Sequence, residues 1–313
     1  MKILISGGSG FIGSHVCDYF LKEGGNVWCI DNFLTSNIEN IENCLNNKNF
    51  VFIEDDICKI NVDKLKNNFD YVLHFASPAS PVDYNKYPVE TLRVNSIGTE
   101  NMIKISLANN SIFLYSSTSE VYGDPEIPVQ NEEYWGKVNP IGERSMYDEG
   151  KRYGEALIMA YHRKYKLNSR IVRIFNTYGP RMRLNDGRVI PNFIVSALTG
   201  KPITIYGDGN QTRSFCYISD LIKGIIRILK CNYNLPINIG SCEEFTIKQL
   251  AKKVKEITGS KVEIIYKPPL PDDPKRRKPD ITKAKKILKW EPVVTLENGL
   301  KETIPYFEKK LKK

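Results

Sequence analysis

A glycine-rich turn near the start of the sequence constrains the fold of this chain more than any other stretch. The apolar residues 3–5 precede it, a helical pattern over residues 14–22 follows it, and the turn reads Gly7-Gly8-Ser9-Gly10-Phe11-Ile12-Gly13. A helix N-terminus after such a turn presents backbone N–H groups and the positive end of its dipole to a pyrophosphate. Glycines at 7, 10 and 13 permit the tight turn and a close approach of backbone to ligand. The stretch therefore predicts a dinucleotide-binding βα unit.

An acidic residue ends the second predicted strand. Residues 26–30 form a strand pattern, and Asp31 follows them, 18 residues after Gly13. A carboxylate roughly 20 residues beyond the glycine turn hydrogen-bonds the adenosine ribose, and it repels a 2′-phosphate. This spacing predicts NAD, rather than NADP, as the cofactor.

Strand-like apolar runs alternate with helical patterns through the first half of the chain. Strands are predicted at residues 50–53, 71–75, 112–116 and 169–175, and helices at about 88–108 and 146–165. Such alternation is typical of a parallel sheet that helices cover on both faces. We therefore expect an α/β fold with a doubly wound, Rossmann-like parallel sheet.

The pattern changes after residue 176, which predicts two parts of unequal size. Residues 1–176 are expected to form the NAD-binding domain, with a return of parts of 212–240, and residues 177–313 a smaller C-terminal α/β substrate lobe. Ligands of parallel sheets bind at the carboxyl ends of the strands. The positions predicted to lie at these ends are the glycine turn, Asp31, Ala76, Ser77, residues 118–120 and Asn176.

Composition excludes several classes of protein. The 313 residues are 41% hydrophobic and 26% charged, as in ordinary globular proteins, and no apolar run reaches the roughly 18 residues of a membrane span. The N-terminal residues resemble a strand rather than a signal peptide, so we expect a cytoplasmic protein without a membrane partner. Seven scattered cysteines predict reduced thiols, and three dispersed histidines predict no metal site.

The formal net charge of +9 allows two interpretations. A basic surface can attract nucleic acid, but lysines spread along the whole chain are more typical of solvated surfaces, so no nucleic-acid partner is predicted. Part of the charge can serve an anionic small substrate. Arg213 and Arg277 are candidates to bind a diphosphate or a carboxylate, although either one taken alone is more typical of a solvated surface arginine.

Tyr147 and Lys151 are the candidate proton-transfer pair. On a helix they are i and i+4 and lie on one face. An ammonium near a phenol lowers the tyrosine pKa, so the pair can remove a proton from a substrate hydroxyl near neutral pH. The spacing alone occurs by chance on many helices, and the pair gains weight from the glycine turn that precedes it in the chain.

The glycine turn and the Tyr147/Lys151 pair together resemble those of the extended short-chain dehydrogenase/reductases. Within their nucleotide-sugar branch, the chain is most similar to the UDP-glucuronate decarboxylases, or UDP-xylose synthases. The motifs that carry this resemblance are at residues 74–81, 117–126, 134–142, 147–152, 173–181, 185–189, 207–213 and 272–280. They span nearly the whole chain.

Related activities differ at the end of the strand 112–116. Sugar-nucleotide 4,6-dehydratases carry an Asp-Glu pair there, whose Asp expels the C6 hydroxyl, but this chain has Ser119 followed by Glu120. The 4-epimerases typically carry neither acid. The departures from the decarboxylase pattern are Phe75 in place of Leu, Arg93 in place of Lys, and a slightly longer stretch at residues 61–68.

The resemblance implies a reaction in which NAD is used and regenerated. Tyr147, near Thr118, takes the proton of the sugar C4 hydroxyl while NAD accepts the C4 hydride. The resulting β-keto acid loses CO₂, and the retained NADH reduces the 4-ketopentose to UDP-xylose. Glu120 is assigned to proton handling and ring positioning, Arg277 to the diphosphate or the sugar end, and Arg213 and Asn176 to UDP.

Each predicted role has a set of residues. The catalytic set is Tyr147, Lys151, Glu120, Thr118, Ser119 and Arg277. The cofactor set is Gly7, Gly10, Phe11, Ile12, Gly13, Asp31, Asn32, Phe33, Thr35, Asp56, Ile57, Ala76, Ser77, Asn95, Tyr147, Lys151, Thr177 and Arg188. The substrate set is Ser80, Tyr84, Glu120, Asn176, Arg188, Tyr206, Arg213 and Arg277.

Two other functions remain open at this point. One is a different UDP-sugar 4-oxidising enzyme, either a 4-epimerase or a decarboxylase that releases the 4-ketopentose. The other is a non-catalytic NAD- or RNA-binding scaffold, for which the net charge is the only support. The resemblance also implies a homodimer, formed through a four-helix contact of the helices near 88–108 and 147–165.

Overall fold

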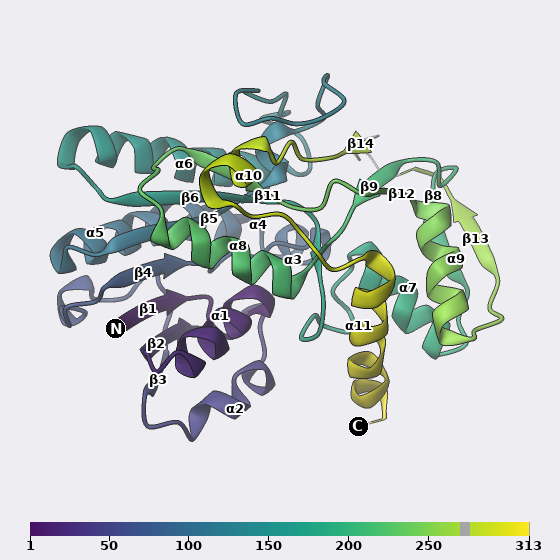
Figure 1. Ribbon diagram of the computed structural model, residues 1–313, viewed down its shortest axis with the longest axis horizontal. Helices are drawn as coiled ribbons and strands as arrows, with labels where there is room; N and C mark the ends of the chain where they lie inside the picture. Colours follow the sequence, from purple (N-terminus) through teal and green to yellow (C-terminus); the bar gives the residue numbers. More distant parts are fainter. Residues whose placement is uncertain (270–275, 313) are drawn as a thin grey trace.

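A seven-stranded parallel sheet forms the larger part of the molecule. The computed structural model describes residues 1–269 and 276–312 (Figure 1). The strand order is β11-β6-β5-β4-β1-β2-β3, and every neighbouring pair is parallel. The strands are β1 Lys2–Ser6, β2 Asn26–Asp31, β3 Phe50–Glu54, β4 Tyr71–His74, β5 Ile112–Thr118, β6 Ser169–Ile174 and β11 Pro236–Ile239. The predicted doubly wound sheet is confirmed.

Helices cover both faces of this sheet. On one face lie α1 Phe11–Lys22, α8 Ile218–Lys230 and α10 Thr282–Leu288, and on the other lie α4 Pro88–Arg93, α5 Thr99–Asn109 and α6 Ser145–Tyr165. Neighbouring residues of a strand point to opposite faces. In β1, Ile3 and Ile5 therefore pack in the core beneath α1 and α8, whereas Leu4 packs in the core beneath α5 and α6.

Two elements differ from their predicted form. Helix α1 begins at Phe11, before the predicted start at residue 14, because the glycine turn itself supplies the first helical residues. The predicted helix 88–108 contains a π-helical turn at Val94–Gly98, between α4 and α5. Such wide turns often occur at functional sites. This one carries the buried Asn95, whose amide donates to the Ser77 hydroxyl at 2.9 Å.

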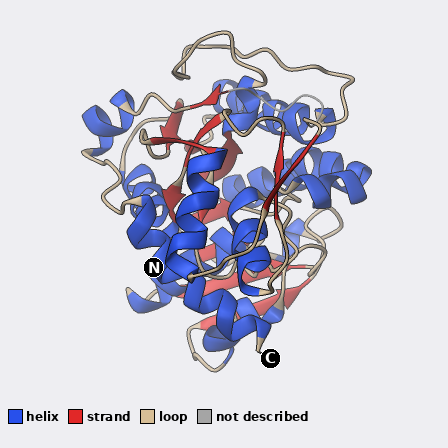
Figure 2. Cartoon of the chain, turned by 90° about the vertical axis from the view of Figure 1, so that its right-hand side faces the viewer, coloured by secondary structure: helices blue, strands red, loops and turns tan. Residues whose placement is uncertain are grey.

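A smaller lobe packs beside the carboxyl ends of the strands, at the right of Figure 1, and Figure 2 views the molecule from that side. Its core joins residues of three helices, such as Phe193, Leu250 and Phe307. The helices are α7 Val189–Leu198, α9 Ile247–Thr258 and α11 Leu296–Leu311, and the strands are β8 Ile203–Tyr206, β9 Thr212–Ser214, β12 Glu244–Thr246, β13 Ile264–Lys267 and β14 Arg276–Arg277. Strand β9 lies between β12 and β14, and β8 pairs with β13.

Short elements connect the two parts. Strand β7, Thr177–Tyr178, pairs with β10, Cys216–Tyr217, and residues 218–239 then run back to the large sheet as α8 and β11. The remaining elements are α2 Glu42–Leu45, α3 Pro81–Lys86 and the 3-10 turns Ile38–Asn40, Val62–Lys64 and Ser119–Tyr122. Because the chain crosses between sheet and lobe several times, residues distant in sequence meet where the two parts face each other.

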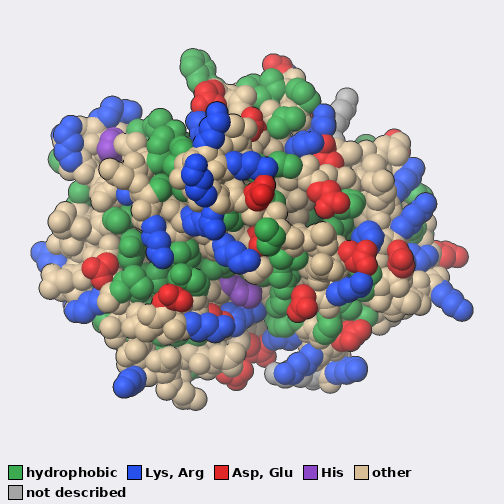
Figure 3. Space-filling model, in the orientation of Figure 1, with side chains coloured by type: hydrophobic (Ala, Val, Ile, Leu, Met, Phe, Trp, Pro, Cys, Tyr) green, Lys and Arg blue, Asp and Glu red, His purple; other side chains and the backbone are tan. Residues whose placement is uncertain are grey.

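The surface carries basic side chains in many places. Figure 3 shows lysines and arginines scattered over one face, with carboxylates among them and a denser group near the centre. Among the described residues, none of the helices is both long and apolar enough to cross a bilayer.

Candidate active site

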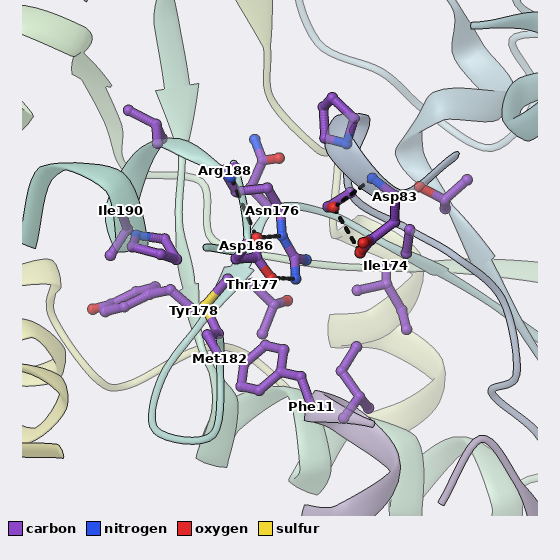
Figure 4. Close-up of a pocket in the computed structure, with 18 of the residues that line it drawn as sticks. Phe11, Asp83, Ile174, Asn176, Thr177, Tyr178, Met182, Asp186, Arg188 and Ile190 are labelled. Atoms are coloured by element: carbon purple, nitrogen blue, oxygen red, sulfur yellow. Dashed lines mark hydrogen bonds and ion pairs between the residues drawn. The ribbon is translucent and has the colours of Figure 1, made fainter. Parts of the chain in front are cut away.

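A cavity of about 380 Å³ lies between the carboxyl ends of the strands and the lobe. Figure 4 shows part of its lining, with Phe11 from the glycine turn, Asn176 from the segment after β6, Thr177 from β7, and Arg188 from the lobe. The predicted residues that line it are Gly7, Gly10, Phe11, Ile12, Gly13, Thr35, Ser77, Ser80, Tyr84, Thr118, Ser119, Glu120, Tyr147, Lys151, Asn176, Thr177, Arg188, Tyr206, Arg213 and Arg277. The structure thus brings most of the predicted site together.

Seven predicted cofactor residues lie outside this lining. They are Asp31, Asn32, Phe33, Asp56, Ile57, Ala76 and Asn95. Asp31 nevertheless adjoins the glycine turn, because its carboxylate accepts the backbone N–H of Ser9 at 3.0 Å and the Ser36 hydroxyl at 2.7 Å. Residues 272–275 of the predicted 272–280 motif lie outside the described residues, whereas Arg277 is described.

The glycine turn is closely packed against backbone. A Cβ on Gly13 would lie 2.1 Å from the Gly7 carbonyl oxygen, and one on Gly7 would lie 2.5 Å from the Ala76 nitrogen. Gly7 also has a φ of +72°, which side chains rarely adopt. Only glycine fits at these two positions, so the N-terminus of α1 stays open toward the cavity. The turn can hold a dinucleotide pyrophosphate there.

Tyr147 and Lys151 lie on the first two turns of α6, with both side chains buried. The Lys151 ammonium donates to the Ser116 carbonyl at 2.8 Å and lies 5.9 Å from the centre of the Tyr147 ring. The Tyr147 ring stacks on Tyr84 of α3, with ring centres 5.3 Å apart. These contacts fix the phenol at the end of β5, beside Thr118.

Burial controls the proton affinities of this pair. It raises the pKa of Tyr147, while a hydrogen bond with Thr118 and the charge of Arg188 act in the opposite direction. Burial also lowers the pKa of Lys151 to about 7. The sequence predicted a tyrosine pKa lowered by the ammonium. The structure differs because desolvation of the enclosed phenol outweighs its favourable neighbours.

Glu120 is held by two arginines. Its carboxylate forms ion pairs with Arg277 of β14 and with Arg144, which directly precedes α6. Arg144 also lies 3.9 Å from a carboxylate oxygen of Asp148, and Arg277 donates to the Gly123 carbonyl at 3.3 Å. We call Glu120, Arg144 and Arg277 the ion-pair cluster.

The ion-pair cluster adds a residue to the predicted site. The guanidinium of Arg277 binds Glu120, and its role in holding the substrate diphosphate or the sugar end stays a prediction. Its burial lowers its pKa to about 10. Arg144 was missed, although its place three residues before Tyr147 is a usable signal, since it lies on the same side of α6 as the proposed base.

A second group of ion pairs was also missed. Arg183 forms an ion pair with Asp83 of α3. Arg188 donates two hydrogen bonds, of 2.5 and 2.7 Å, to the carboxylate of Asp186 (Figure 4). The first pair joins the segment after β4 to the segment after β7. Arg183 and Asp83 are 100 residues apart in the sequence, so only the folded chain reveals their contact, whereas Arg188 and Asp186 are local neighbours.

Among the residues that the structure describes, acidic and sulfur side chains do not gather as metal ligands. In the described ranges 1–269 and 276–312, no group of three or more His, Cys, Asp or Glu residues is arranged to hold an ion. The donors that line the cavity are instead hydroxyls, amides, guanidiniums and backbone N–H groups, which suit phosphates and sugars.

A parallel sheet with a glycine turn after β1 and a Tyr-Lys pair on α6 defines an extended short-chain dehydrogenase/reductase. A sequence profile of the GDP-mannose 4,6 dehydratase family matches residues 4–303, and the chain belongs to this family. The resemblance predicted from the motifs is confirmed.

Curated relatives carry a more specific name. The chain is 48% identical to "UDP-glucuronic acid decarboxylase 1" of Xenopus tropicalis, over 99% of this chain and 73% of the relative. It is 49% identical to "UDP-glucuronic acid decarboxylase 3" of Arabidopsis thaliana, over 96% of this chain and 87% of the relative.

Solved structures share the whole fold. UDP-glucose 4-epimerase of Thermotoga maritima superposes with a TM-score of 0.91 at 33% identity, covering 99% of this chain and all of that one. UDP-glucuronic acid 4-epimerase of Bacillus cereus, solved with UDP-glucuronic acid and NAD, gives a TM-score of 0.88 at 33% identity, with 99% and 100% covered.

Proposed function

We propose that the protein converts UDP-glucuronate into UDP-xylose and CO₂ with NAD as a regenerated cofactor. The observation that carries this proposal is Glu120, held by Arg277 in the cavity of Tyr147 and preceded by Ser119 where a dehydratase needs an acid. The names of the relatives point to the same reaction.

NAD fits the glycine turn. The cradle that Gly7 and Gly13 leave open suits its pyrophosphate, and Asp31 stands at the end of β2 for its ribose. When bound, NAD supplies a hydride acceptor for the sugar C4 atom and returns the hydride at the end of the cycle. The residues of this chain do the remaining work of binding, orientation and proton transfer.

Tyr147 is the proposed base for the C4 hydroxyl. Its phenol lies beside Thr118, and the ammonium of Lys151 is 5.9 Å from its ring. A sugar hydroxyl placed against Tyr147 gives up its proton as C4 becomes a ketone. The same proton returns when the ketone is reduced. Lys151, with a pKa near 7, can pass that proton on without a large energetic cost.

The ion-pair cluster is proposed to bind the sugar end that carries the carboxylate. Once C4 is a ketone, the carboxylate on C5 is β to a carbonyl, so the electron pair of the breaking C–C bond enters the ketone as an enolate. The guanidiniums of Arg144 and Arg277 can orient the carboxylate. Because both already bind Glu120, they hold the departing group less tightly, which lowers the cost of its loss.

A product assay tests the proposal. Purified protein with NAD and UDP-glucuronate is expected to release CO₂ and UDP-xylose, detected by NMR. Tyr147→Phe is expected to lower the rate by about 1,000-fold or more, since its proton acceptor is gone. Tyr165→Phe is the matched control, because that exposed tyrosine lies on the same helix away from the cavity. An epimerised UDP-sugar acid, or a 4-ketopentose with free NADH, would contradict the proposed reaction.

We further propose a homodimer that pairs α4 and α6 of one copy with those of a second. The support is a set of exposed apolar side chains on these helices and the π-turn between α4 and α5, namely Val89, Leu92, Ile97 and Tyr153. Leu92→Asp is expected to shift the sedimentation coefficient to that of a monomer. Val293→Asp introduces the same charge at an exposed position elsewhere, and it should leave the assembly unchanged.

Three finer assignments belong to the same proposal. Residues 1–176, with parts of 212–240, are proposed to bind NAD, and residues 177–313 to bind mainly the UDP sugar through Asn176 at the boundary, Tyr206 and Arg213. A cytoplasmic location is supported by the seven cysteines, which are all free thiols.

Binding of nucleic acid is not proposed, because the basic side chains are interspersed with carboxylates.

A further inference from the structure

Strand β14 brings Arg277 from the lobe to the ion-pair cluster. It pairs in parallel with β9, so that Arg277 lies opposite Arg213, and β9 pairs on its other side with β12 (Figure 1). Strands usually contain at least three residues, whereas β14 has two. So short a strand has few ladder hydrogen bonds of its own, and side-chain contacts are needed to fix its direction.

Glu244 of β12 binds the residues on both sides of Arg277. Its carboxylate accepts two hydrogen bonds of 2.6 Å from the Arg276 guanidinium, and the Lys278 ammonium lies 3.0 Å from one of its oxygens. The Thr212 hydroxyl of β9 donates to the other oxygen at 3.0 Å. A bidentate pair of arginine and carboxylate fixes geometry as well as adding energy. One carboxylate therefore joins three neighbouring strand segments of the lobe.

The neighbours of Arg277 point away from it. Successive side chains of an extended segment face opposite sides, and the burial follows this alternation, because Arg276 is exposed, Arg277 buried and Lys278 half-buried. Arg277 points to Glu120, whereas the two neighbours point to Glu244. The contacts on one side of the segment thus set the direction of the guanidinium on the other.

Glu244 is charged whenever the proposed reaction can run. Hydrogen bonds from Arg276, Lys278 and Thr212 lower its pKa to about 2, in spite of its partial burial. Its hold on the two cations therefore does not depend on pH near neutrality. Glu244 also lies outside the lining of the main cavity, so it has no direct contact with a substrate bound there.

We propose that Glu244 is a positioning residue for the proposed decarboxylation. By holding Arg276 and Lys278, it directs the guanidinium of Arg277 toward Glu120 and the sugar end of the substrate. This inference rests on the proposed function, and it adds to it a residue that acts only through Arg277.

The pairing of β14 with β9 relates this role to the proposed UDP site. Strand β9 carries Arg213, which lines the main cavity and is proposed to bind UDP. An enzyme can use its contacts with the non-reacting part of a substrate to orient the reacting part. UDP bound at β9 and the sugar end near Arg277 are thus held by adjacent strands, which Glu244 fastens together.

Two substitutions remove the contact from either side. Glu244→Gln keeps the shape of the side chain and loses its charge, and Arg276→Gln removes the bidentate partner at an exposed position. Glu297→Gln is the matched control, because Glu297 also binds two cations of the lobe, Lys253 and Lys301, but lies outside the cavity lining. Steady-state kinetics with UDP-glucuronate and the NAD-bound protein give kcat and KM, and calorimetry gives the Kd for UDP.

The expected effect is on kcat. Glu244→Gln should lower kcat about tenfold, with KM and the Kd for UDP within about twofold of the unmodified protein, because orientation at the sugar end is lost and the UDP site is kept. Arg276→Gln should lower kcat about fivefold, and Glu244→Asp should recover part of the loss. Glu297→Gln should change none of the three quantities.

A double-mutant cycle distinguishes a positioning role from general support of the lobe. Arg277→Lys lowers kcat by itself. In that background Glu244→Gln should lower kcat by less than about twofold further, because the guanidinium that Glu244 directs is already absent. If the two losses multiply, Glu244 acts independently of Arg277, and the proposal is wrong.

Three other results would also overturn the proposal or its basis. If Glu244→Gln weakens UDP binding as much as it lowers kcat, Glu244 maintains the lobe as a whole. If kcat does not change, other contacts, such as that of the Lys278 N–H with the Gln130 side chain at 2.8 Å, are sufficient to orient Arg277. If the unmodified protein releases no CO₂ from UDP-glucuronate, the proposed function fails. A crystal structure of Glu244→Gln would then still test the positioning role, which is refuted if Arg277 keeps its contact with Glu120.

Discussion

The glycine turn and the ion-pair cluster line the same cavity, but the turn presents backbone atoms and the cluster presents charged side chains. The turn is made of backbone, with Gly7 and Gly13 packed against other main-chain atoms. The cluster is made of charged side chains from three distant segments, Glu120, Arg144 and Arg277. A backbone site is sensitive to added volume and indifferent to charge, whereas a cluster of ion pairs is sensitive to charge. The substitutions below use this difference.

The largest expected effect follows from adding a methyl group to the turn. Gly13→Ala would place a Cβ 2.1 Å from the Gly7 carbonyl oxygen and 2.8 Å from the Gly8 Cα atom. Neither backbone atom can move cheaply, so the N-terminus of α1 must shift. We expect NAD affinity, measured by calorimetry, to fall about 100-fold or more, equivalent to about 2.7 kcal/mol.

A control isolates the local strain of a glycine substitution. Gly24→Ala, at a φ of +74°, meets nothing within 4 Å, so it should lower stability by about 1 kcal/mol and leave NAD affinity unchanged. Normal NAD binding by Gly13→Ala would mean that the backbone of the turn is more adaptable than its packing indicates.

A smaller effect is expected from removing one charge of the cluster. Arg144→Gln leaves Glu120 with Arg277 alone, so the carboxylate loses one of the contacts that orient it. We expect kcat to fall about 30-fold, with Arg144→Lys restoring part of it and NAD affinity unchanged in both. If NAD affinity falls as much as kcat, the ion-pair cluster also supports NAD binding, and the glycine turn and the cluster do not have separate roles.

The same contrast explains what the sequence could predict. The glycine turn lies within residues 7–13, and its strand and helix neighbours are adjacent in the chain, so spacing alone located it. Tyr147 and Lys151 were found because helical periodicity places i and i+4 together. The contact of Arg277 with Glu120 joins positions 157 residues apart, and no local pattern encodes such a contact.

Three other features were beyond sequence reasoning for related reasons. The pairing of Asp83 with Arg183 depends on how the segment after β4 meets the segment after β7. The π-turn around Asn95 leaves hydrophobic periodicity nearly intact, so the region was predicted as one helix. The raised pKa of Tyr147 follows from burial by residues that only the fold brings together.

A smaller effect, on substrate binding, is expected from removing the Asp83–Arg183 ion pair. Asp83→Asn removes the charge but keeps the shape, so the segment of α3 should hold the loop 181–188 less firmly. We expect KM for UDP-glucuronate to rise about threefold to tenfold with kcat nearly constant, because binding and not chemistry is affected. A fall in kcat with constant KM would instead place Asp83 in the chemical step.

The smallest expected effect is on stability, and it arises in the sheet next to the glycine turn. His74 ends β4, where its ring hydrogen-bonds Ser6 of β1 at 2.7 Å and Thr99 of α5 at 3.1 Å. Burial, together with the charge of Lys151, lowers its pKa from 6.5 to about 3. Between these two values the unfolded chain binds a proton that the folded chain does not. The free energy of unfolding must therefore fall as the pH drops below about 6.5.

Urea unfolding at two pH values measures this contribution. Acidification from neutral pH to about 5 should lower the free energy of unfolding by about 2 kcal/mol through His74, since one pKa unit corresponds to about 1.36 kcal/mol. His74→Gln is expected to be less stable at neutral pH but to lose less on acidification. The ion-pair cluster of Glu120, Arg144 and Arg277 contains no histidine, so the contribution of His74 can be measured independently of it. If His74→Gln loses as much stability on acidification as the unmodified protein, a group other than His74 titrates. The acid sensitivity would then not arise in the sheet next to the glycine turn.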